Sequence, residues 1–159
     1  MSFSPIRILT QSDLALLQVL KLIQESFTFM IGRIDPPSSV PSLTLQDLTE
    51  KAQTDWILGG GDPDEACVVA SPRQNALYLG KMAVHPSMRG QGIARALVQA
   101  CEGIAVGLGF GWLELQVRVE LVENQNVFAK IGFVKTAENS QLCYDHATEI
   151  TMQKNLRNS

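Results

Sequence analysis

Two spacings of apolar residues divide this chain into expected strands and helices. Alternation of apolar and polar residues, or a short run that is almost wholly apolar, predicts a strand. The strands expected on this basis cover residues 5–9, 56–58, 66–70, 76–84, 112–119 and 149–154, and another strand begins at residues 133–134. Apolar residues three or four apart predict helices, which we expect at residues 14–29, 44–54, 92–108 and 123–131. The chain therefore mixes both kinds of element.

Caps and turns indicate how these elements connect. Thr44 and Asp47 have the spacing of a capping box, with Asp in place of the preferred Glu. Turn residues at 59–64 and 71–75 predict three consecutive antiparallel strands, whereas the helix at 92–108 predicts a parallel crossover. The apolar stripe of the first helix is assigned to Leu14, Leu17, Val19, Leu20 and Ile23. These patterns alone indicate an α/β or α+β fold, with one domain over residues 1–159.

The segment between the fourth strand and the third helix has the composition of a phosphate-binding loop. Pro86 ends the strand by removing a backbone donor, and Gly90 and Gly92 open the helix. The first turn of a helix has unpaired N–H groups that attract phosphate, and Arg89 adds a charged donor fork. The spacing fits neither a P-loop nor a dinucleotide fingerprint. Another class of pyrophosphate site is one interpretation, and a plain strand-to-helix turn is the other.

Two motifs in the second half of the chain carry a family resemblance. Arg89, Gly92 and Ala94 follow a strand that ends in Val84, and residues 128–133 read Phe-Ala-Lys-Ile-Gly-Phe. Together they resemble the GCN5-related N-acetyltransferases (GNAT), whose acyl-CoA loop reads Arg/Gln-x-x-Gly-x-Gly/Ala. The resemblance covers roughly residues 77–156, about half of the chain. In addition, Gly-Arg-Ile-Asp-Pro-Pro at residues 32–37 is similar to uncharacterised bacterial members, and the loop of residues 32–41 could border a substrate pocket.

The resemblance implies both a fold and a reaction. The fold would be a mixed, mostly antiparallel sheet of about six or seven strands with about four flanking helices, splayed at the acyl-CoA site. The reaction would transfer acetyl from acetyl-CoA to a primary amine by direct attack, without a metal. The residues implied to bind the cofactor are Met82, Ala83, Val84, Arg89, Gly90, Gln91, Gly92, Ile93, Ala94, Asn124, Phe128 and Lys130.

The chain departs from the family's pattern at the acid that protonates the departing thiolate. Many members have a Tyr where this chain has Phe128, which has no proton to donate. We expect Tyr144 to take this part, with Tyr78, Cys143 or water as alternatives.

The general base also differs from the family's pattern. Gln116 and Tyr78 stand where relatives place a Glu. Glu114 and Glu120 lie on the Gln116 face of an alternating strand, and we expect Glu114 to be the base, acting through water. A solvated strand face would have the same pattern.

Composition narrows the choice of partners. The formal charge of −3 provides no basic surface for nucleic acid or an anionic membrane, and no apolar run is long enough to span a bilayer. Three cysteines and two histidines without ligand spacing predict free thiols and no metal. We expect a cytoplasmic acetyltransferase for a small-molecule or peptide amine, with a homodimer as one option. The alternatives are a non-catalytic acyl-CoA-binding or sensing domain and a structural protein.

Overall fold

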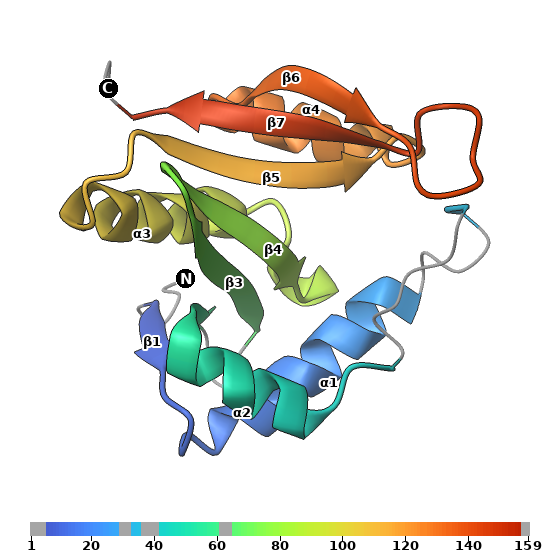
Figure 1. The fold of residues 1–159 in the computed structure, drawn as a ribbon. Helices are drawn as coiled ribbons and strands as arrows, with labels where there is room; N and C mark the ends of the chain where they lie inside the picture. Colours follow the sequence, from blue (N-terminus) through green and yellow to red (C-terminus); the bar gives the residue numbers. More distant parts are fainter. Residues whose placement is uncertain (1–5, 29–32, 36–41, 61–64, 157–159) are drawn as a thin grey trace.

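The computed structural model describes residues 6–28, 33–35, 42–60 and 65–156, and these residues form one seven-stranded sheet (Figure 1). The strand order is β1-β2-β3-β4-β5-β7-β6. The bounds are β1 Arg7–Leu9, β2 Trp56–Gly60, β3 Ala66–Arg73, β4 Ala76–Val84, β5 Trp112–Arg118, β6 Val134–Asn139 and β7 Glu149–Asn155. All neighbouring strands are antiparallel except β4 and β5. The expected mixed, mostly antiparallel sheet is confirmed.

Four helices of the described residues cover the two faces of this sheet. They are α1 Ala15–Thr28, α2 Leu45–Thr54, α3 Ile93–Gly107 and α4 Val122–Ile131. Figure 1 shows α1 and α2 on one face, and α3 and α4 on the other. On the first face α1 and α2 pack over β1 to β4, and on the second α3 buries one apolar side against β3, β4 and β5. The crossover from β4 through α3 to β5 is therefore the expected parallel connection.

The buried stripe of α1 differs from the expected one. It consists of Ala15, Leu16, Val19, Leu22 and Ile23. Leu14 and Leu17, which we expected in the core, are 92% and 60% exposed. Both choices are compatible with helical spacing in this leucine-rich segment, and packing against the sheet selects one of them.

Strands β2 and β3 continue into residues that were expected to form turns. Gly59 and Gly60 pair with Cys67 and Ala66, so β2 extends into the expected glycine turn. Similarly, β3 continues to Arg73, although a proline at position 72 suggested a turn. Beyond Ala70, β3 has only β4 as a neighbour, and an edge of this kind tolerates proline. Residues 5 and 29 of the expected elements lie outside the described residues.

The start of α2 has the expected capping box. The Thr44 hydroxyl accepts from the Asp47 backbone N–H at 3.1 Å, and the Asp47 carboxylate accepts from the Thr44 N–H at 2.8 Å. Asp thus replaces Glu in this motif with both reciprocal bonds intact.

Two irregularities of β4 open the sheet. The parallel pairing of β4 with β5 ends at Tyr78 opposite Glu114, although both strands continue. In addition, β4 has a bulge opposite β3, because Gly80 pairs with Val69 and Ala83 pairs with Cys67. Two β4 residues therefore lie opposite one β3 residue, and the strand bends there. Within the sheet β4 and β5 thus separate after residues 78 and 114, which is the expected splay.

Candidate active site

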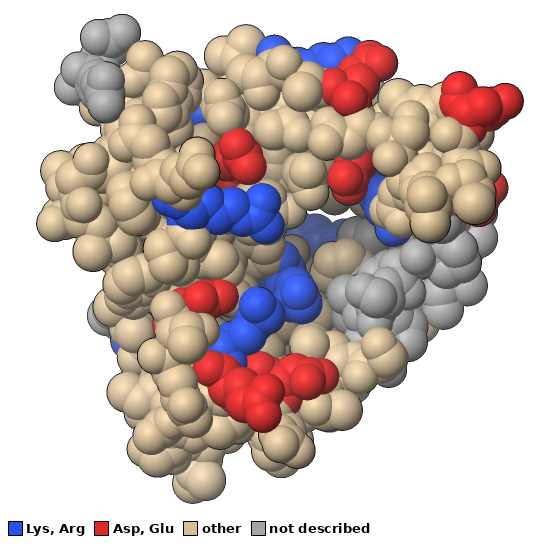
Figure 2. All heavy atoms as spheres, viewed as in Figure 1, with Lys and Arg blue, Asp and Glu red and all other residues tan. Residues whose placement is uncertain are grey.

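A cavity of about 930 Å³ occupies the space where β4 and β5 separate. Its walls come from β4, β5, α3, α4, the end of α1 and the glycine loop before α3. In Figure 2, Lys and Arg side chains gather inside this hollow, with Asp and Glu side chains around it. The volume lies within the range of small-molecule and cofactor sites. The splay therefore produces a site rather than a packed interior.

The glycine loop has the backbone that its sequence requires. Gly90 and Gly92 have φ angles of +79° and +78°, in the left-handed region that favours glycine. A Cβ built at either position would meet no atom within 4 Å, so the space above this backbone is open. Gly92 is the N-cap of α3 and supplies no side-chain cap. The first N–H groups of α3 therefore face a space in which an anion can approach them.

The residues before this loop fix its position. Pro86–Met88 forms a short 3-10 turn, in which the His85 ring nitrogen Nδ1 accepts from the Ser87 N–H at 3.2 Å. Met88 is buried in the main core, and so is Ile93 at the start of α3. The loop is thus anchored by core packing on both sides.

The structure brings most of the predicted cofactor residues together at one cavity. Met82, Ala83, Val84, Arg89, Gly90, Gly92, Ile93, Ala94, Asn124, Phe128 and Lys130 all line it. Gln91 does not, because its side-chain amide turns back to donate to the Ser87 carbonyl at 3.5 Å. Arg95 also lines the cavity and was missed, although it lies one helical position after the recognised motif. Its guanidinium donates to the Lys130 carbonyl at 3.2 Å and joins α3 to the end of α4.

The two residues expected for catalysis lie outside the residues that line this cavity. The Glu114 carboxylate accepts from the Gln153 amide at 2.8 Å and lies 3.8 Å from the Arg73 guanidinium. The Tyr144 hydroxyl donates to the Asp35 carboxylate at 2.6 Å. The Glu114 carboxylate and the Tyr144 hydroxyl are therefore both bonded to residues that do not line the cavity.

The further candidates of the sequence analysis differ in their placement. Tyr78 lines the cavity, and its hydroxyl donates to the Gln116 side-chain oxygen at 3.2 Å. Burial is the main cause that raises the pKa of Tyr78 above its ordinary value, so the phenol keeps its proton at neutral pH. Glu120 accepts from the Asp35 N–H at 3.0 Å, and Cys143 is exposed in a left-handed backbone with φ +72°. Of these, only Tyr78 faces the cavity.

Besides Arg95, five charged residues of the cavity wall were not named as site residues from the sequence: Arg33, Lys81, Arg118, Glu123 and Glu149. Arg118 on β5 lies directly opposite Glu149 on β7 in the strand register. A hydrogen bond from its own backbone N–H is the main cause that holds the pKa of Glu123 below its usual range, and Arg33, which donates to Glu123 at 2.6 Å, lowers it further. Alternation along β5 and β7 places Arg118 and Glu149 on the Gln116 face, which could have identified them.

The described residues contain neither a cluster of metal ligands nor a helix that could span a membrane. No group of three or more His, Cys, Asp or Glu side chains in this part of the chain is arranged to hold a metal ion. Similarly, none of the described helices has the length and apolar character needed to cross a bilayer.

Solved structures share this fold over almost the whole chain. The PaiA N-acetyltransferase of Thermoplasma acidophilum in complex with coenzyme A has a TM-score of 0.81 at 18% identity, over 98% of this chain and 99% of that chain. The ribosomal-protein-S18-alanine N-acetyltransferase of Escherichia coli has a TM-score of 0.69 at 18% identity, over 98% and 94%. A chimera of the Vibrio cholerae spermidine N-acetyltransferase SpeG and hSSAT has a TM-score of 0.73 at 14% identity, over 99% and 98%.

At sequence identities this low, the similarity to these structures establishes the fold alone. No curated protein sequence matches the chain. Residues 45–133, which run from α2 to the end of α4 and contain the glycine loop, match the sequence profile of the Acetyltransferase (GNAT) family. Because this match covers more than half of the chain, and because solved N-acetyltransferases share its fold, the chain belongs to the GNAT family of acetyltransferases.

Proposed function

We propose that this protein transfers the acetyl group of acetyl-CoA to a primary amine of a small molecule or peptide. One observation carries the proposal: a single cavity joins the open glycine loop to the polar face of β5 and β7 through the splay of the sheet. Phosphate-binding backbone lies at one end and charged side chains lie at the other. A thioester bound between them would meet an amine that enters from the opposite face of the sheet.

The cofactor is proposed to lie along β4 and the start of α3. Arg89 and the N–H groups after Gly90 and Gly92 would hold the pyrophosphate, because charge-assisted bonds and a helix N-terminus favour it. The backbone of residues 82–84 would pair with the pantetheine arm. Asn124, Phe128 and Lys130 would contact the same arm from α4. The open space above both glycines supports this proposal, since phosphate must approach the backbone closely.

The reaction is proposed to proceed by direct attack. The neutral amine nitrogen forms a bond to the thioester carbon, the carbonyl electrons move onto oxygen, and the carbon–sulfur bond then breaks to release CoA thiolate. A β4 backbone N–H at the bulge would donate to that oxygen. This hydrogen bond would stabilise the negative charge on the oxygen most strongly where water is excluded. Positioning of the two reactants would supply much of the rate.

Glu149 is the residue that we now propose as the base, in place of Glu114. Among the described residues, Glu123 and Glu149 are the carboxylates that line the cavity, and Glu123 is paired with Arg33. Glu149 lies at the start of β7 on the same face as Gln116. It would remove the amine proton directly or through one water. The departing thiolate would take its proton from solvent or from Tyr78, which remains protonated at neutral pH.

The cysteines support the proposal that the protein acts in the cytoplasm. Cys67, Cys101 and Cys143 are all free thiols in the described residues. Free thiols suit a reducing compartment, which supports the proposed cytoplasmic location.

Two measurements test this function. Calorimetry with acetyl-CoA should show binding with the folded protein, and thiol release should rise with at least one primary amine of a panel that runs from diamines to peptide N-termini. Absence of acetyl-CoA binding to the folded protein would remove the proposal entirely.

Phe128 favours a second candidate function, an acyl-CoA-binding or sensing domain without turnover. Its ring lines the cavity and lacks the hydroxyl found in many relatives. This candidate predicts tight acetyl-CoA binding with thiol release at background for every amine. Phe128→Tyr separates the two cases: a gain of activity shows that thiolate protonation was limiting, whereas no gain with a silent panel supports the sensing function.

A further inference from the structure

Three residues between α1 and α2, Arg33, Ile34 and Asp35, form a segment that we call the strap. Its first contact is the Arg33 guanidinium, which donates to Glu123 in the first turn of α4 at 2.6 Å. Its second is the Asp35 backbone N–H, which donates to Glu120 in the turn between β5 and α4 at 3.0 Å. The two contacts join positions 90 and 85 residues apart in the chain. The strap is thus fastened to one end of α4.

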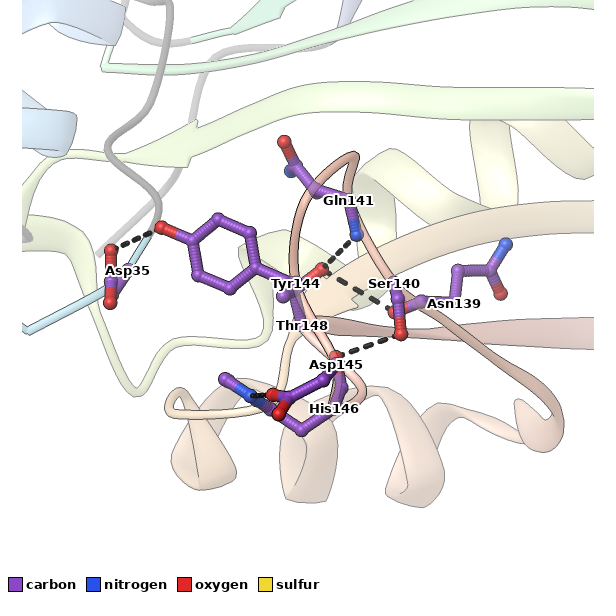
Figure 3. A network of polar contacts seen from close by, with 8 residues as sticks. All are labelled: Asp35, Asn139, Ser140, Gln141, Tyr144, Asp145, His146 and Thr148. Atoms are coloured by element: carbon purple, nitrogen blue, oxygen red, sulfur yellow. Dashed lines mark hydrogen bonds and ion pairs between the residues drawn. The ribbon is translucent and has the colours of Figure 1, made fainter.

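Tyr144 fastens the strap from a third direction. Figure 3 shows its ring extending from the loop between β6 and β7 to Asp35, and the hydroxyl donates to the Asp35 carboxylate at 2.6 Å. The same hydrogen bond is the main cause that raises the pKa of Tyr144 above its ordinary value. The phenol proton is therefore held between the ring and a carboxylate, outside the residues that line the cavity.

The loop that carries Tyr144 is itself held in place. Ser140 donates to the His146 carbonyl at 2.8 Å, and the Gln141 N–H donates to the hydroxyl of the fully buried Thr148 at 3.1 Å (Figure 3). The Tyr144 ring also meets the His146 ring edge-on, with centroids 5.6 Å apart. The loop can therefore act as an anchor for the strap.

The strap is also part of the cavity wall. Arg33 and Ile34 line the cavity, and Ile34 is 9% exposed and belongs to the main core. Arg118 and Glu149, on the face of β5 and β7 from which the acceptor is proposed to enter, line the same cavity. A change in the position of the strap would therefore change the room for the acceptor and leave the glycine loop untouched.

We infer that Tyr144 is a positioning residue: through its hydrogen bond to Asp35 it fixes the strap, and with it the room that the cavity leaves for the acceptor amine. The inference rests on the proposed function. The strap belongs to the Gly-Arg-Ile-Asp-Pro-Pro stretch for which neither the phosphate site nor the chemistry accounts. Its two charged side chains are the ones that make the contacts to α4 and to Tyr144.

The kinetic test compares Tyr144→Phe, Asp35→Ala and the double variant on the amine panel. Each single variant should raise the KM for a small amine about five- to twentyfold, leave the KM for acetyl-CoA unchanged and admit bulkier amines. The double variant should be no worse than either single one, because one hydrogen bond is lost in all three. Leu142→Ala is the control, since Leu142 lies in the same loop and is 91% exposed.

Two kinetic outcomes would overturn the inference. If Tyr144→Phe lowers kcat for every amine while Asp35→Ala leaves the kinetics unchanged, Tyr144 takes part in proton transfer. If both variants keep the wild-type KM and the wild-type range of amines, the strap does not set the room for the acceptor amine.

Hydrogen exchange tests the strap without turnover. In Tyr144→Phe, the amide of Asp35, which donates to Glu120, should exchange at least about tenfold faster than in the wild type or Leu142→Ala. Unchanged exchange would mean that Tyr144 does not hold the strap. If acetyl-CoA binds but no amine is turned over by any variant, the acetyltransferase proposal fails, and the exchange rates still decide the positioning role.

Discussion

Phe128 differs from the tyrosine of many relatives by one atom, the hydroxyl oxygen. Its ring packs edge-on against Phe133, with centroids 5.8 Å apart, so the aromatic shape of the family's motif is retained without the hydroxyl. The hydroxyls of the two tyrosines considered as alternatives have other partners. Tyr144 donates to Asp35, and Tyr78 donates to Gln116. At the residue scale, the glycine loop therefore follows the family's pattern, whereas the position of the family's tyrosine does not.

Arg89→Ala should weaken acetyl-CoA binding by about 1.5–3 kcal/mol, because charge-assisted hydrogen bonds to the pyrophosphate would be lost. Calorimetry at two salt concentrations measures this effect, and the affinity of the wild type should depend more steeply on salt. Arg7→Ala is the charge-matched control, since Arg7 lies on the distant strand β1 and pairs with Asp13. Equal affinity of both variants would exclude Arg89 from the phosphate site.

Glu149→Gln should lower kcat about 10²-fold, the usual contribution of a positioned general base, and should leave acetyl-CoA affinity unchanged. Glu114→Gln is the matched control, because Glu114 lies on the same sheet face but outside the cavity wall. The kcat of Glu114→Gln should remain within about threefold of the wild type, as expected for an ordinary polar contact. The reverse order of the two effects would restore Glu114 as the base.

At the scale of elements, the glycine loop and α3 act together. Ile93, Leu97, Val98, Cys101 and Ala105 bury one side of α3 against the sheet. This packing fixes the axis of the helix and hence the direction in which its first N–H groups point. The loop before it has room for an anion only because both of its glycines project no side chain into that space.

Gly92→Val should abolish measurable acetyl-CoA binding while most of the fold is retained. A valine at φ +78° is strained, and its branched side chain would fill the open space at the start of α3. Gly103→Val is the control within the same helix, where a Cβ also meets nothing within 4 Å and φ is helical. Circular dichroism establishes folding, and calorimetry measures binding. Normal binding by folded Gly92→Val would mean that the glycines only turn the chain.

At the scale of the whole molecule, the two sides of the sheet differ in how much they are covered. The face under α3 holds the larger core cluster, which includes buried residues of every strand from β2 to β5 and of β7. On the other face, α1 and α2 cover β1 to β4, and β5 and β7 lie beyond them. The site therefore lies where the sheet separates and one covering layer ends.

The buried thiol of Cys101 should make the stability of this core depend on alkaline pH. Burial raises the pKa of Cys101 from 9.0 to about 12, so the folded state keeps a proton that the unfolded state loses. This contribution to stability is fully present below pH 9.0 and is lost as the pH rises from there toward 12.

Urea unfolding between pH 7 and pH 10.5 measures that dependence. The wild type should lose stability more steeply above pH 9 than Cys101→Ala. The alanine variant will be less stable at every pH because it leaves a small cavity, so only the slopes are compared. Parallel slopes would contradict the pKa shift.

The sequence by itself determined the order of the elements, the position of the glycine loop and most of the cavity wall next to that loop. These features depend on local spacing: Pro86, Gly90 and Gly92 fix a turn and a helix start within a few residues, and the apolar period that follows fixes which side of α3 is buried. Met82, Ala83 and Val84 line the cavity for the same reason, because they belong to the strand that enters the loop.

Only the tertiary structure decided which polar side chains face the cavity. Glu149 and Arg118 lie opposite each other on the neighbouring strands β7 and β5. Arg33 contacts α4, and Asp35 contacts Tyr144, in each case over about 90 residues or more of sequence. No local spacing encodes such contacts, because they depend on strand register and on where β4 and β5 stop pairing. For this reason alternation correctly gave the face of Glu114 but not its distance from the site, and a tyrosine expected to donate a proton to thiolate instead donates one to Asp35.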